Sequence, residues 1–220
     1  RVTMRHKPLR TSCPLAAYSA SINFIISNLE IPQYNNYKYY FDSSGLWKLY
    51  YNSRNEFMIE FKNGPEDVTL AFIDVKPNNG TGTIFYTEHG SKDPRIQFLP
   101  FVYPVDEVIF INLLPSYSGI LLHACGLNDN GHGFIFLGAS GAGKSTTSRL
   151  WSDESGVTVL SDDRIIIRYT DENLYAYGTP WHGDAGASNP NRMGIEGIFF
   201  LEHSKKNYLK PLTRMDAATR

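Results

Sequence analysis

The sequence predicts an α/β protein with a β-rich N-terminal half, and two observations support this prediction. Between Ser19 and Leu114 the chain is rich in Tyr, Phe, Ile and Val, and Gly, Pro and Asn interrupt the apolar runs. This pattern is typical of short strands joined by turns. After Pro115–Gly119, apolar runs alternate with one helical segment around a glycine-rich loop. We therefore expect a β-rich region over 1–115 and an α/β domain over 116–220.

Apolar segments separated by turn-forming residues predict a meander of strands in the N-terminal region. These segments are Trp47–Tyr51, Phe57–Phe61 and Val68–Val75. The aromatic run Tyr34–Phe41 precedes them. Because aromatic residues favour strands, we expect this run to pack in a strand core. A platform that stacks a nucleobase or a peptide is the alternative.

The C-terminal half is expected to hold one helix among several strands. The expected strands are Ile120–Gly126, Gly133–Leu137, Val157–Leu160, Arg164–Tyr169, Leu174–Tyr177 and Gly197–Leu201. The expected helix, Lys144–Trp151, follows the second of these strands and lies at the centre of a strand–loop–helix–strand unit.

The loop before this helix reads Gly138-Ala-Ser-Gly-Ala-Gly-Lys-Ser145 and satisfies the pattern G-x-x-x-x-G-K-[ST] of phosphate-binding P-loops. Glycines let backbone N–H groups turn toward phosphates, and the helix N-terminus adds a favourable dipole. Lys144 would reach the β- and γ-phosphates, and the Ser145 hydroxyl would bind Mg²⁺. We therefore expect ATP and Mg²⁺ as cofactors, although no motif separates adenine from guanine. The expected nucleotide contacts are Gly138, Ser140, Gly141, Ala142, Gly143, Lys144, Ser145 and Thr146.

Two adjacent acids, Asp162 and Asp163, follow the next predicted strand, and Asp162 lies 18 residues after Lys144. Near a metal-bound triphosphate, one carboxylate can support the metal while the other accepts a proton from an attacking hydroxyl. We assign the base to Asp162, and the metal to Asp163 together with Ser145. A solvated β-turn is the alternative for this pair.

His123 lies on the predicted strand upstream of the P-loop, where a lone histidine is usually a hydrogen-bonded core residue. The His-bearing strand, the P-loop and Leu160-Ser-Asp-Asp163 together resemble the HPr kinase/phosphorylase family and, more distantly, phosphoenolpyruvate carboxykinase. The resemblance covers about Leu121–Arg168. It implies a P-loop kinase fold with a mixed sheet, His123 in the active site, and the acid pair as base and metal support. It also implies a Ser hydroxyl of a protein or peptide as acceptor, and a homo-oligomer.

The sequence departs from that family at Thr146, where the family usually has an acid, and in its aromatic-rich first half. We also find no second signature stretch of the kind associated with dephosphorylation. The resulting prediction is an ATP-dependent kinase, in which Lys144 and His123 stabilise charge on the phosphoryl group. Three alternatives stay open: a small-molecule alcohol as acceptor, a nucleotide-gated binding protein with weak ATPase activity, and carboxykinase-like chemistry. The last would need a cationic cluster, for which the sequence offers Arg164, Arg168 and Arg192.

Other polar residues could extend the site. The segment Thr179–Asp184, with Trp181 and His182, could line an acceptor site or form an ordinary structured loop. Arg192 could stabilise transition-state charge, although a surface position is its common role, and Arg149 is expected to be solvated.

Bulk composition narrows the partner classes. The formal net charge is −1, with 21 basic and 22 acidic residues, so no nucleic-acid footprint is evident. No apolar run is long enough to span a bilayer, and no apolar stretch follows the basic start as in a secretory leader. The two cysteines, Cys13 and Cys125, are far apart and fit a reducing compartment. We expect a cytoplasmic protein without nucleic-acid or membrane partners.

Overall fold

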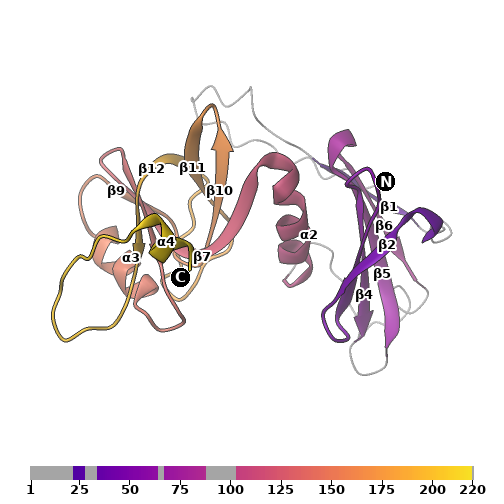
Figure 1. Ribbon diagram of the computed structural model, residues 1–220, viewed down its shortest axis with the longest axis horizontal. Helices are drawn as coiled ribbons and strands as arrows, with labels where there is room; N and C mark the ends of the chain where they lie inside the picture. The colour runs from indigo at the N-terminus through magenta and orange to yellow at the C-terminus, as the bar shows by residue number, and fades with distance from the viewer. Residues whose placement is uncertain (1–21, 28–33, 64–66, 88–102, 220) are drawn as a thin grey trace. The chain divides into compact units, whose positions relative to one another are not determined.

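A computed structural model describes residues 22–27, 34–63, 67–87 and 103–219. The described residues form a mixed α/β protein that is rich in strands, with two mixed sheets and few helices (Figure 1). The chain divides into two compact units, each built from two segments. Unit 1 comprises Arg1–Leu121 and Ile167–Glu172, and unit 2 comprises Leu122–Ile166 and Asn173–Arg220.

The first sheet has the strand order β1-β6-β5-β4-β3-β2. Its neighbours are antiparallel except for the parallel pair β1–β6. The strands are β1 (Asn23–Ser27), β2 (Lys38–Asp42), β3 (Trp47–Tyr51), β4 (Phe57–Asn63), β5 (Val68–Lys76) and β6 (Thr81–Tyr86). Short 3₁₀ turns occur at η2 (Tyr34–Asn36) and η4 (Pro77–Asn79). The predicted strands of the meander are confirmed as β3, β4 and β5, whereas the sequence analysis did not identify β1 and β6.

Helix α2 (Val105–Leu113), followed by the 3₁₀ turn η5 (Leu114–Tyr117), packs on this sheet and was not predicted. Its Val105, Val108 and Ile109 are buried in one cluster with residues of β3–β6. Their spacing places them on one helical face, and Asp106 and Glu107 in the first turn favour the helix N-terminus.

Strand β2 lies at the edge of the first sheet, so the prediction that Tyr34–Phe41 packs in a core is wrong. Tyr39, Tyr40 and Phe41 are 61%, 71% and 46% exposed. Among the described strands it pairs with β3 alone. Its aromatic rings contact aromatic rings of β3. The ring centroids of Phe41 and Trp47, for example, are 5.1 Å apart.

The second sheet has the order β10-β11-β12-β8-β7-β9, and β10 also pairs with β7. Every strand predicted for this half is present, as is helix α3 (Lys144–Ser152), which lies beside β9 (Figure 1). The strands are β7 (Gly119–Asp129), β8 (His132–Leu137), β9 (Val157–Ser161), β10 (Arg164–Thr170), β11 (Asn173–Gly178) and β12 (Arg192–Phe200), and a short helix α4 (Arg214–Ala218) follows.

Three strands of the second sheet end at the same edge. Strand β7 is antiparallel to β8 and to β9. Leu137 at the end of β8 pairs with Ala124, and Ser161 at the end of β9 pairs with Gly126 on the same strand. Strand β12 is parallel to β8, and its last residue Phe200 pairs with Leu137. The loops that follow β8, β9 and β12 therefore begin close together.

The six residues 167–172 belong to unit 1, although unit 2 precedes them in the chain. The backbone N–H of Tyr169 donates to the Ser118 carbonyl oxygen at 3.0 Å. The Arg168 Nε donates to the Tyr117 carbonyl oxygen at 3.0 Å, and the Tyr117 hydroxyl donates to the carbonyl oxygen of Pro77. A late segment of the chain thus supplies hydrogen bonds to the N-terminal unit.

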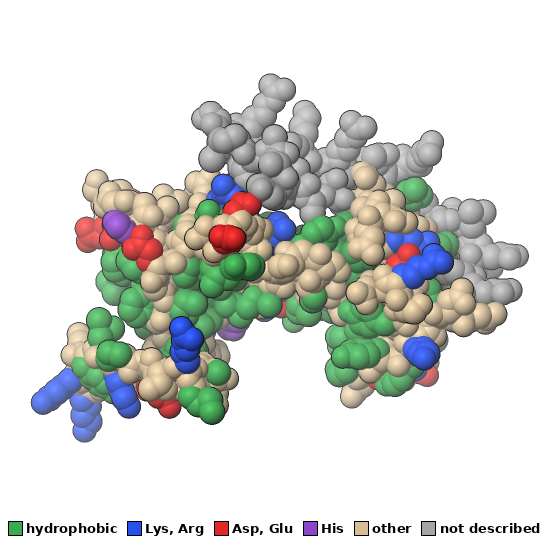
Figure 2. Space-filling model, turned by 45° about the horizontal axis from the view of Figure 1, so that its top comes forward, with side chains coloured by type: hydrophobic (Ala, Val, Ile, Leu, Met, Phe, Trp, Pro, Cys, Tyr) green, Lys and Arg blue, Asp and Glu red, His purple; other side chains and the backbone are tan. Residues whose placement is uncertain are grey.

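Surface and membrane-related features are simple. Among the described residues, no helix is both long and apolar enough to cross a membrane. On the face shown in Figure 2, acidic and basic side chains are interspersed, in keeping with the formal net charge of −1. Cys125 is buried, and Cys13 lies outside the described residues.

Candidate active site

The loop after β8 has the glycine conformations that its sequence pattern requires. Gly141 and Gly143 have φ angles of 79° and 106°, in the left-handed region where side chains are strained. At Gly138, an added Cβ would lie 2.8 Å from the Cβ of Ala142, so the first turn of the loop closes only on a glycine. Helix α3 begins directly after Gly143, at Lys144.

Lys144 is held inside this loop. Its side chain is buried, with the residue 7% exposed, and Nζ donates to the carbonyl oxygens of Gly138 at 2.7 Å and Ala139 at 3.1 Å. Ser145 in the first turn of α3 is half-buried, whereas Ser140 and Thr146 are exposed. A buried ammonium group in a loop of turned backbone is a suitable cradle for phosphate oxygens.

His203 joins the loop from the segment after β12. Its Nε2 lies 2.9 Å from the Gly141 carbonyl oxygen, within hydrogen-bonding distance. Sequence reasoning missed this residue because it lies 62 positions away from Gly141. The signal in the sequence was the apolar segment Gly197–Leu201, because such a strand can pair with the strand that precedes the P-loop.

A second group of side chains forms at the β9–β10 turn. The Asp163 Oδ1 atom lies 2.8 Å from Arg164 Nη1 and 3.4 Å from His123 Nε2. The His123 side chain is 52% exposed and that of Asp163 is 27% exposed, so both reach solvent. Oδ2 of Asp163 makes no hydrogen bond or ion pair within the described part of the chain. The structure thus brings together His123 and Asp163, two of the predicted site residues.

Asp162 occupies a different environment from its neighbour. It is 2% exposed, and its carboxylate accepts three backbone N–H groups. Oδ1 accepts from Gly183 at 2.9 Å and from Ala187 at 3.2 Å, and Oδ2 accepts from Ala185 at 2.8 Å. These contacts make Asp162 the anchor of the loop between β11 and β12. A base must reach the proton that it removes, so this geometry disfavours Asp162 in the role that the sequence analysis gave it.

Two hydroxyl hydrogen bonds, one donated to the anchored loop and one donated by it, also link the loop to β9 and β10. The Ser161 hydroxyl donates to the Trp181 carbonyl oxygen, and the Thr179 hydroxyl donates to that of Arg164. Helix α3 contacts the same loop, because Arg149 Nη2 donates to the Asp184 carbonyl oxygen at 2.9 Å. Arg149 is exposed, as the sequence analysis expected, and it also links the P-loop helix to the loop. His182 in this loop is exposed.

Buried Cys125 lies near both parts of the site. Burial raises the pKa of Cys125 to about 12, and the charge of Asp162 adds to this rise. Ser148 and the charge of Lys144 act on the same thiol in the opposite direction. The P-loop lysine and Asp162 therefore both act on one buried residue of β7.

The arginines that could have formed a carboxykinase-like cluster have separate contacts. Arg164 pairs with Asp163, and Arg192 lies over the Tyr175 ring with its Cζ 4.8 Å from the centroid. Arg168 belongs to unit 1, where it lies over the Tyr117 ring.

The metal-binding potential of the site is limited to isolated oxygen donors. Within the part of the chain that the structure describes, no three His, Cys, Asp or Glu side chains form a cluster that could hold a metal. The Ser145 hydroxyl fits a Mg²⁺ ion that takes most of its ligands from phosphates and water, as Mg²⁺ commonly does, whereas no contact links Asp163, the other predicted metal ligand, to Ser145 within the described residues.

Comparison of the chain with protein-family models and with curated proteins gave no match in either case.

Proposed function

We propose that this protein is a P-loop phosphotransferase that binds ATP at Gly138–Ser145 and transfers the γ-phosphoryl group to a hydroxyl. The acceptor we propose is a Ser of a protein or peptide, as in the HPr kinase/phosphorylase family that the motifs resemble. The main support is the shared edge at which β8, β9 and β12 end. Ligands of open α/β sheets bind at such strand ends.

We assign the general base to Asp163, to which the sequence analysis had given the metal, and we no longer assign it to Asp162. Asp163 is partly exposed and has one carboxylate oxygen without a partner among the described residues. His123 and Arg164 hold the other oxygen. They therefore position the carboxylate while Oδ2 accepts the proton of the acceptor hydroxyl. Asp162 keeps the neighbouring loop in place and does not exchange protons.

The remaining residues bind and orient the triphosphate. Backbone N–H groups of the P-loop and the N-terminus of α3 hold the phosphates, and Lys144 neutralises charge on the transferring group. Ser145 would hold Mg²⁺, which when bound shields negative charge between the phosphates. The loop around Trp181 and His182 lies next to the acid pair and is our candidate for the surface that contacts the acceptor.

The test is transfer of label from γ-labelled ATP in the presence of Mg²⁺. The purified chain is incubated with a cell lysate separated into protein, peptide and small-molecule pools. We expect label in the protein or peptide pool, and we expect Lys144→Ala to reduce the rate of transfer about 10²–10³-fold because a positioned cation is lost. Lys206→Ala, an exposed lysine of the same unit, is the matched control and should keep the wild-type rate.

The other outcomes separate the alternatives. Label in the small-molecule pool would support a small-molecule kinase. Binding of ATP with slow hydrolysis and no labelled acceptor in any pool would support a nucleotide-gated binding protein instead. Absence of ATP binding would overturn the proposal altogether.

A smaller effect is expected at His203. Its contact with Gly141 stabilises the tip of the P-loop, and one hydrogen bond contributes about 0.5–1.5 kcal/mol. His203→Ala should therefore weaken ATP binding about two- to tenfold, measured by isothermal titration calorimetry. His132→Ala is the control, because His132 lies at the opposite end of β8 and contacts Glu196. Equal losses in the two variants would show that the His203 contact has no specific role.

A further inference from the structure

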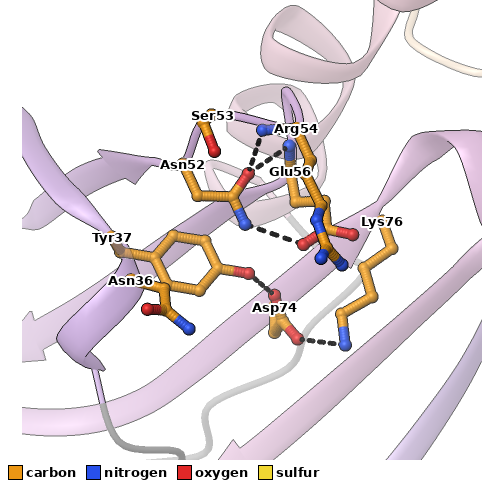
Figure 3. A pocket seen from close by; sticks show the side chains of 8 residues that line it. All are labelled: Asn36, Tyr37, Asn52, Ser53, Arg54, Glu56, Asp74 and Lys76. Carbon is orange, nitrogen blue, oxygen red and sulfur yellow. Dashed lines mark hydrogen bonds and ion pairs between the residues drawn. The ribbon is translucent and has the colours of Figure 1, made fainter.

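Unit 1 contains a polar pocket that has no part in the proposed phosphoryl transfer. It lies among the turn η2, the β3–β4 turn and strand β5, and has a volume of about 490 Å³ (Figure 3). This volume falls within the range of small-molecule sites, roughly 300–1,000 Å³. Its charged lining residues are two carboxylates, Glu56 and Asp74, and two cations, Arg54 and Lys76.

Asp74 is the central group of this pocket. It is 8% exposed, although carboxylates are rarely buried without a specific reason. Oδ1 accepts the Tyr37 hydroxyl at 2.6 Å, and Oδ2 lies 3.4 Å from Lys76 Nζ. Figure 3 shows its carboxylate between the Tyr37 ring and the Lys76 ammonium. Because each carboxylate oxygen can accept two hydrogen bonds, both oxygens can accept another donor.

Tyr37 keeps this arrangement fixed. Burial, the hydrogen bond to Asp74 and the Asp74 charge all raise the pKa of Tyr37. The hydroxyl therefore stays protonated and remains a donor to Asp74 at every physiological pH. The Tyr37 hydroxyl therefore fixes the orientation of the Asp74 carboxylate toward the pocket, where it can meet a cationic ligand group.

The β3–β4 turn presents the second cation. Asn52 Oδ1 accepts the backbone N–H groups of Arg54 and Glu56, and Asn52 Nδ2 donates to Glu56 Oε2 at 2.7 Å. The exposed Arg54 side chain makes no ion pair with any residue that the structure describes. In Figure 3 its guanidinium extends toward Lys76, so two cations converge on one side of the pocket. A guanidinium fork and an ammonium group together fit a carboxylate ligand.

We propose that this pocket binds a free α-amino acid, with its carboxylate on Arg54 and Lys76 and its ammonium group on Asp74 and Glu56. Two positive and two negative side chains give the pocket a balanced charge. The two carboxylates would repel a ligand that carries only negative charge, and the two cations would repel a ligand that carries only positive charge. A zwitterion satisfies both sets, and its side chain is left to face Tyr37 and Asn36.

The test uses the full chain without ATP, so its outcome does not depend on the proposed kinase activity. Each standard amino acid is titrated by isothermal titration calorimetry. We expect at least one to bind with a Kd of about 1 mM or lower. The α-amide of that amino acid lacks the carboxylate, and its N-acetyl derivative lacks the ammonium group. Each should bind about tenfold more weakly or worse, because each loses a charge-assisted contact.

Variants locate the binding. Arg54→Ala should weaken binding about tenfold without affecting the fold, since Arg54 is exposed. Lys38→Ala is the matched control, because Lys38 is an exposed cation of the same sheet outside the pocket, and it should bind as the wild type does. Asp74→Asn should reduce binding while its circular dichroism spectrum stays unchanged.

Three results would overturn the proposal. The first is that no amino acid binds. This result would overturn the proposal even if a monosaccharide or a sugar phosphate bound to the pocket. The second is equal binding of the amino acid and its two blocked derivatives, which would exclude zwitterion recognition. The third is binding that Arg54→Ala and Asp74→Asn leave unchanged, which would place the ligand elsewhere on the chain.

Discussion

Replacing Asp163 by Asn is expected to lower the turnover of phosphoryl transfer about 10²–10⁴-fold, the usual contribution of a general base. Asn has nearly the same shape as Asp but cannot accept the proton. The side chain of Asp163 is 27% exposed, so the substitution should leave the free energy of unfolding nearly unchanged. Because the P-loop is untouched, the affinity for ATP should also remain close to that of the wild type. Steady-state kinetics and calorimetry with ATP measure the two quantities separately.

Glu154→Gln is the matched control for this variant, because Glu154 is an exposed carboxylate in the same unit. It should transfer phosphate at the wild-type rate. If Asp163→Asn is fully active while a folded Asp162→Asn is inactive, the base is Asp162, as the sequence analysis assigned it.

Replacing Asp162 by Ala is expected to destabilise unit 2 by about 3 kcal/mol or more. Three partly buried backbone N–H groups, of Gly183, Ala185 and Ala187, would lose their acceptor, and each donor left unsatisfied away from water costs about 1–3 kcal/mol. Urea unfolding monitored by circular dichroism measures the global effect. Hydrogen–deuterium exchange measures the local one, since these three amides should exchange much faster than in the wild type.

Glu154→Ala is the corresponding stability control and should change the free energy of unfolding by less than about 0.5 kcal/mol, as exposed substitutions usually do. Wild-type stability together with wild-type exchange at all three amides in Asp162→Ala would contradict the anchoring role.

Local sequence patterns predicted most of the second sheet. The strands around the P-loop have continuous apolar runs, and Gly141 and Gly143 stand where the loop requires positive φ angles. The same patterns failed at α2, because its six apolar residues out of nine are spread around the helix and show little helical periodicity. They failed at Tyr39–Phe41 as well. Aromatic content indicates a strand, but whether that strand lies in the centre or at the edge depends on long-range pairing.

Sequence patterns identified residues suited to the candidate site, but they did not assign the correct role to each residue. The sequence identified the acid pair, but adjacent residues of a turn can face opposite surroundings, and only the fold shows that Asp162 faces the Gly183–Ala187 backbone. His203 and the pocket around Asp74 depend on contacts between residues far apart in the chain. No spacing rule covers such contacts.

The late segment 167–172 has a consequence for how the chain folds during its synthesis. The N-terminal unit emerges first from the ribosome, yet its hydrogen bonds at Tyr117 and Ser118 require Arg168 and Tyr169. By then strand β8, the P-loop and helix α3 have already been made. A nascent chain halted before residue 167 would therefore leave these two carbonyl groups without their donors, so unit 1 reaches its full set of hydrogen bonds only after much of unit 2 has been made.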